Sequence, residues 1–84
     1  MQSENTIRKN LNLDYEDCEY YWDEWKDDIV KTIRKYEKIY EQKNKDWGYC
    51  LESDFKKETD FLEEINIKIK KVANENGLII YERI

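Results

Sequence analysis

A run of acidic and aromatic residues between Asp14 and Asp28 holds the most distinctive chemistry in this sequence. Its fifteen residues include eight carboxylates, one lysine and five aromatic rings, for a net charge of −7. Carboxylates attract the Lys and Arg residues of a partner, and aromatic rings supply contact area at the centre of protein interfaces. The composition predicts a surface that binds a protein with a basic face.

Helical spacing separates the inward side chains of this run from the outward ones. At about 100° per residue, Trp22 and Trp25 share one side with neighbouring apolar residues, so both are expected to hold the helix in place. Tyr20 falls on the opposite side, among the acids. The candidate partner-binding residues are therefore Glu16, Glu19, Tyr20, Asp23, Glu24 and Asp27.

The density of negative charge suggests what kind of partner is bound. Over about 21 Å of helix, the run carries roughly one net charge per 3 Å, and a single nucleic-acid strand carries one per about 3.4 Å. Such a face could compete for a groove built for nucleic acid, for example in a nuclease. The alternative is a solvated helix face, which accounts for the acids but not for Tyr20.

Catalytic, metal and cofactor chemistry find little support. The chain has no histidine, and Cys18 and Cys50 form no Cys-x-x-Cys pair, so imidazole catalysis and zinc binding are not expected. Carboxylate pairs such as Glu63 and Glu64 define no pocket. We expect no enzyme activity, no catalytic residue, no metal and no cofactor.

The surrounding elements follow from hydrophobic spacing. A stripe from Tyr15 to Tyr40 recurs every three or four residues and predicts a helix over about 14–44. A second stripe predicts a helix over about 54–75. The sequence therefore predicts a mainly α domain spanning 1–84, with two long antiparallel helices, a short C-terminal strand or extended tail over 78–84, and a flexible or extended N-terminal arm over 1–13.

One conflict leaves a second architecture open. Residues 65–69 alternate apolar and polar with period two, and Asn76-Gly77 can form a tight turn. The alternative is an α+β fold with a C-terminal β-hairpin over 65–83.

Charge also predicts how the two helices pair. Residues 29–45 are basic, and the acids of the second helix come early in it. Antiparallel packing would therefore place Lys31, Arg34, Lys35 and Lys38 beside acids of the second helix.

These features predict a non-catalytic, acidic protein-binding protein. We expect an inhibitor of the anti-CRISPR, anti-restriction or nucleic-acid-mimic type, encoded by a phage or mobile element. Alternatives are a homo-oligomeric structural or adaptor module, such as a homodimer, and an immunity or antitoxin protein. Because the net charge is −5 and the basic residues of 29–45 are expected to pair with acids of the chain, neither direct nucleic-acid binding nor membrane binding is expected. Few cysteines and residues of A/T-rich codons favour the cytoplasm of a bacterial cell, native or phage-infected.

Overall fold

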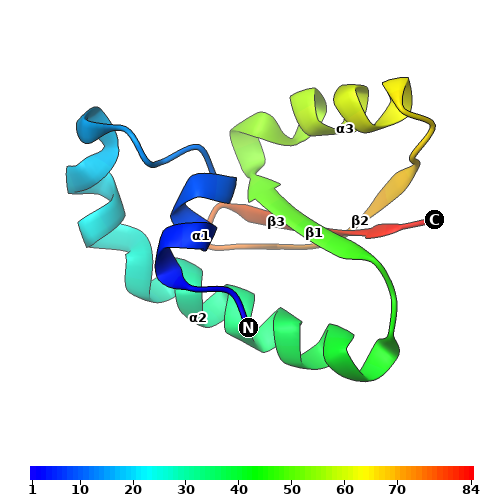
Figure 1. Ribbon diagram of the computed structural model, residues 1–84, viewed down its shortest axis with the longest axis horizontal. Helices are drawn as coiled ribbons and strands as arrows, with labels where there is room; N and C mark the ends of the chain where they lie inside the picture. Colours follow the sequence, from blue (N-terminus) through cyan, green and yellow to red (C-terminus); the bar gives the residue numbers. More distant parts are fainter.

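Three helices pack against a three-stranded antiparallel sheet in the computed structural model, which describes residues 1–84 (Figure 1). The helical elements are α1 (Glu4–Asn10), the 3-10 helix η1 (Glu16–Cys18), α2 (Glu19–Lys43), the 3-10 helix η2 (Glu52–Asp54) and α3 (Phe55–Glu64). The strands are β1 (Trp47–Leu51), β2 (Ile69–Glu75) and β3 (Leu78–Arg83). Figure 1 shows α2 below the sheet and α3 above it, so the sheet forms the middle layer.

The long first helix is confirmed within its predicted bounds. It ends where Asn44 adopts a left-handed backbone with φ of 55° and donates its N–H to the Tyr40 carbonyl. Its start differs from the expectation, because η1 comes first and the α-helix begins at Glu19 rather than near residue 14.

The prediction of a second long helix is wrong. α3 has ten residues and ends at Glu64, because Asn66 adopts a left-handed backbone with φ of 63° that a helix cannot continue through. Residues 69–75 are strand β2 instead. The domain is therefore mixed α+β rather than mainly α, which matches the hairpin alternative in part.

The hairpin joins β2 to β3 and differs from its predicted form in extent. Its first strand begins at Ile69 rather than at residue 65, and a third strand, β1, lies in the stretch between the two predicted helices. Asn76 and Gly77 make the turn with φ of 54° and 76°, both positive as a type I′ hairpin turn requires.

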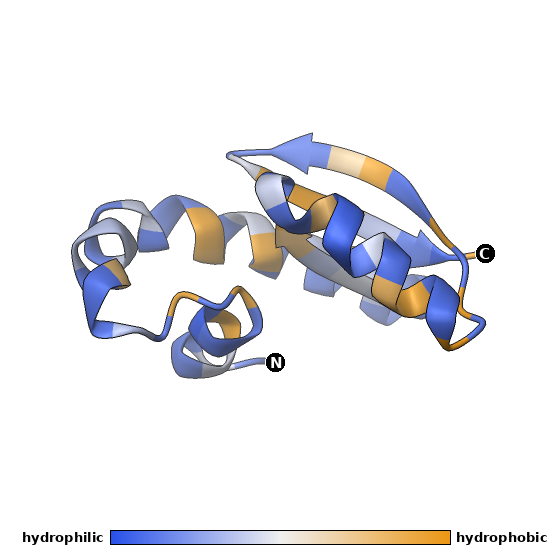
Figure 2. Cartoon of the chain, turned by 90° about the horizontal axis from the view of Figure 1, so that it is seen from above, coloured by the Kyte–Doolittle hydropathy of each residue, from blue (hydrophilic) through white to orange (hydrophobic).

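β3 is the central strand and lies between the other two, in the order β1-β3-β2. Leu78 and Ile80 belong to the same buried cluster as Ile33 of α2. On the opposite face, the Tyr81 hydroxyl donates a hydrogen bond to Glu58 of α3. Alternate β3 side chains therefore pack toward opposite helical layers. Seen from above in Figure 2, α3 lies across the sheet, with hydrophobic residues near its C-terminal end.

The N-terminal segment is a packed element rather than an arm. Ser3 caps α1 by accepting a hydrogen bond from the Thr6 N–H. Ile7 and Leu11 are buried in the same core as α2 and β3. Ile7 and Leu11 lie four residues apart and form the buried side of this short helical segment.

Basic residues of α2 pair differently from the prediction. Lys35 contacts Glu75 of β2 at 2.9 Å, and Arg34 contacts Glu37 within α2 at 2.6 Å. The predicted pairing failed because β2, and not a second long helix, lies beside this part of α2.

No helix combines the length and the apolar character needed to cross a membrane.

Candidate functional site

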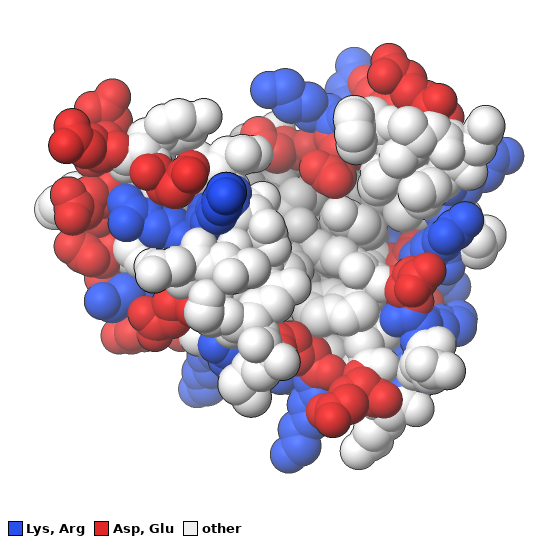
Figure 3. Space-filling view, in the orientation of Figure 1, with Lys and Arg blue, Asp and Glu red and all other residues white.

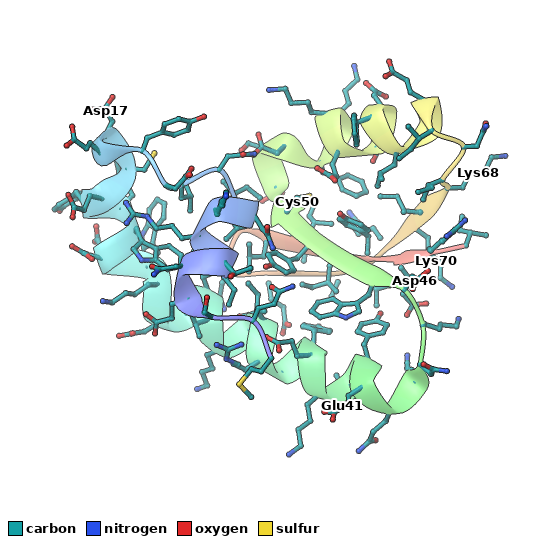
Figure 4. All side chains as sticks on the ribbon, viewed as in Figure 1. Asp17, Glu41, Asp46, Cys50, Lys68 and Lys70 are labelled. Atoms are coloured by element: carbon teal, nitrogen blue, oxygen red, sulfur yellow. The ribbon has the colours of Figure 1, made fainter.

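The first turns of α2, together with η1, carry the acidic run away from the sheet (Figure 1). We call the six predicted residues the acidic face, and all of them are exposed: Glu16, Glu19, Tyr20, Asp23, Glu24 and Asp27. Figure 3 shows acidic groups gathered along this side of the molecule, and Figure 4 places Asp17 at its outer tip. The structure therefore brings these residues together on one projecting surface, where their role in binding remains a prediction.

No carboxylate of this run is neutralised within the chain. The structure contains five ion pairs, and all of them involve residues from Arg34 onward. On α2, the stretch Glu19–Asp28 holds five acids and one lysine. At 1.5 Å per residue, this is about one net charge per 3.4 Å, close to the spacing along a single nucleic-acid strand.

Three exposed aromatic rings run along the same part of α2. We call Tyr20, Tyr21 and Trp25 the aromatic row; their exposed fractions are 72%, 50% and 49%. The Tyr20 and Tyr21 rings lie 5.6 Å apart edge to face, and the Tyr21 and Trp25 rings lie 5.4 Å apart. A contiguous exposed apolar patch, unlike a single exposed side chain, is typical of an interaction site, and the row adds such an apolar centre to the acidic surroundings.

Trp25 corrects an expectation, because helical spacing had placed it in the core. Trp25 lies on the stripe between Trp22 and Ile29, which are both buried, but it lines an open cleft and is half exposed. Trp22, one turn earlier on the same stripe, is buried, and the Arg8 guanidinium lies 5.9 Å from the centre of its ring. Trp22 is thus buried as expected, here beside α1, whereas Trp25 contributes to the surface.

The two cysteines do not form a reactive pair. Cys18 and Cys50 are both free thiols, the first partly buried and the second buried on β1 (Figure 4). Burial raises the pKa of Cys50 to about 11, so its thiol stays protonated near neutral pH and is a poor nucleophile. No three His, Cys, Asp or Glu side chains cluster closely enough to hold a metal ion.

Comparison with known proteins adds no family to this description. No protein-family model, curated protein or solved structure matches the chain. The candidate site therefore depends on its own geometry: an exposed row of aromatic rings, flanked by carboxylates without internal partners.

Proposed function

We propose that this chain is a non-catalytic binding protein that covers a basic surface on another protein. The observation that carries the proposal is the aromatic row surrounded by unpaired carboxylates. Exposed rings supply desolvated contact area, and carboxylates around them steer and orient a cationic partner.

The favoured target is a nuclease or another protein that handles nucleic acid. Such proteins display basic grooves, and the charge spacing along Glu19–Asp28 resembles that of a single strand. Occupying such a groove would exclude the nucleic acid, which is inhibition of the anti-CRISPR, anti-restriction or mimic type. An immunity or antitoxin protein would use the same chemistry against a toxic nuclease.

Affinity capture from the cells that encode the chain, with and without phage infection, tests the proposal. The bait variant Asp23→Lys/Asp27→Lys reverses two charges within the acidic face. The matched control Glu63→Lys/Glu64→Lys makes the same reversal on two exposed acids of α3. Wild type and control should retain one specific protein that the face variant loses. Equal capture by both double variants would show that the acidic face is only a solvated surface.

A second candidate is a homo-oligomeric module, favoured by the exposed Phe61 and Ile65 at the end of α3. These side chains are one helical turn apart and present apolar surface to solvent. Light scattering separates the candidates. A dimer or tetramer that persists at high salt favours the module, and a monomer favours the binding protein.

A further inference from the structure

An open cleft lies between α2 and one end of the sheet, directly beside the aromatic row. Its volume is ≈ 700 Å³, within the range of sites that bind small ligands. Eight residues from α2, β1, η2 and the β2–β3 turn line it: Trp25, Asp28, Ile29, Leu51, Glu52, Ser53, Asn76 and Gly77. Because Trp25 contacts Tyr21 and also lines the cleft, the cleft continues the surface assigned above to partner binding.

The lining combines apolar surface with two carboxylates and no cation. Ile29 and Leu51 contribute apolar walls. Asp28 comes from α2 and Glu52 from η2, so acids from two separate elements contribute to the lining. Neither acid takes part in an ion pair. The cleft therefore carries two negative charges that nothing within the chain balances.

Three of the twelve aromatic rings in this chain have a cation over them, and Trp25 and Trp47 are among the rings that have none. Arg8 lies over Trp22 at 5.9 Å, and Lys35 and Lys43 lie over Tyr36 and Tyr40 at 5.1 and 5.5 Å. No cation of the chain lies over Trp25, although tryptophan is the ring that attracts cations most strongly.

We propose that this cleft receives an arginine side chain of the protein partner. The inference rests on the proposed function and names the group that the partner must present. An arginine stem would pack along the apolar walls, and its planar guanidinium would stack on Trp25 while donating to Asp28 and Glu52. Arginine fits better than lysine, because its fork binds carboxylates in two directions and its plane stacks on an aromatic ring.

Titration of the full chain with N-acetyl-arginine amide tests the proposal without the partner. The readout is the NMR shift of the Trp25 indole N–H, with the neutral isostere N-acetyl-citrulline amide as a second probe. Saturable binding of the arginine probe is expected, with at least tenfold weaker binding of the citrulline probe. Equal binding of the two probes would overturn the proposal, and so would no binding at all.

Two matched double variants test whether the two carboxylates of the cleft bind the arginine probe. Asp28→Asn/Glu52→Gln removes both cleft charges and should weaken binding of the arginine probe about tenfold, or roughly 1.4 kcal/mol. Asp23→Asn/Asp27→Asn removes two charges from the same helix outside the cleft and should weaken it less than about threefold, through the general field alone. Equal losses in the two variants would overturn the proposal.

Both variants are expected to fold. Asp28 and Glu52 are exposed, and their local hydrogen bonds come from the backbone: the Asp28 carbonyl accepts from Thr32, and the Glu52 N–H donates to the Gly77 carbonyl. The amide fingerprint of each variant checks this. Should the double variant misfold, Glu52→Gln alone gives the same comparison with a smaller loss.

Affinity capture distinguishes failure of this inference from failure of the proposed function. A partner retained in full by Asp28→Asn/Glu52→Gln but lost by Asp23→Lys/Asp27→Lys would overturn the arginine cleft and leave the binding function standing. A cleft that binds the arginine probe while no partner is captured would leave the inference on the cleft's chemistry standing without the proposed function.

Discussion

The Tyr40 hydroxyl donates a hydrogen bond of 2.5 Å to the Glu82 carboxylate, joining the last turns of α2 to the central strand β3. Lys43 and Lys45 approach the same carboxylate at 3.8 and 3.4 Å. The hydrogen bond from Tyr40, and then the nearby lysines, hold the pKa of Glu82 below its ordinary value of 4.5. The ring of Tyr40 also stacks on Trp47 of β1, so three elements meet at this residue.

This contact predicts how stability changes in acid. Because the pKa of Glu82 is lower in the folded chain than in the unfolded chain, the ionised carboxylate adds to the free energy of unfolding. This stabilisation is complete above about pH 4.5 and is lost as the pH falls through the folded pKa. Urea unfolding of wild type and Glu82→Gln between pH 3 and pH 7 measures it. Wild type should be the more stable at pH 7, and the difference should shrink below pH 4.5. A difference that does not change with pH would contradict this.

Tyr20 and the neighbouring acids should affect binding through different rate constants. Asp23→Lys/Asp27→Lys should slow association about tenfold at low salt, because exposed charges steer the encounter, and added salt should reduce the difference. Tyr20→Ala should raise the dissociation rate, because it removes a desolvated contact of about 1–3 kcal/mol. Surface plasmon resonance against the captured partner resolves both rates. If Tyr20→Ala slowed only association, Tyr20 would not be a packed contact.

Because Trp25 is half exposed, its removal should destabilise the domain less than removal of a fully buried side chain. Ile33 is fully buried, so Ile33→Ala should cost about 2–5 kcal/mol of unfolding free energy. Trp25→Ala, at a half-exposed position, should cost about 1 kcal/mol or less. Thermal or urea unfolding of the two variants provides the measurement. Equal losses would place Trp25 in the core that helical spacing had assigned to it.

Gly48 leaves room for the ring of Tyr81 on the neighbouring strand. A Cβ atom at position 48 would lie 2.6 Å from that ring, too close without movement. Gly48→Ala should therefore destabilise the domain by about 1–3 kcal/mol. Combining it with Tyr81→Ala, which empties the space, should cost less than the two single losses added together. Strict additivity in this double-mutant cycle would refute the proposed clash.

The long helix could be predicted because its signal is local and sustained. The end of α3 could not be, because Phe55, Leu62, Ile65 and Val72 keep helical spacing across a region where the chain changes from helix to strand. The missed signal is an asparagine just after a helix, whereas the turn at Asn76 was among the predictions. Asn12, Asn44 and Asn66 follow the three α-helices closely, and Asn76 forms the hairpin turn; all four have positive φ, which Asn tolerates better than most residues.

Exposure of the acidic face was also predictable, since outward acids on a helix need no knowledge of the rest of the fold. Burial of the opposite side was harder to predict. The stripe specifies which side of α2 is apolar, but whether Trp22 or Trp25 is covered depends on α1, η2 and β1, which are distant in sequence. The cleft at Trp25 was missed for the same reason.

The position of β3 within the sheet constrains the order in which the chain can assemble during translation. The strand that joins β1 to β2 follows both of them in the sequence. At roughly 5–20 residues per second, the ribosome adds the stretch from Leu51 to Leu78 in roughly one to five seconds. During that interval β1 has no neighbour for its backbone, and a nascent chain that stalls before Ile80 keeps this strand open to other polypeptides.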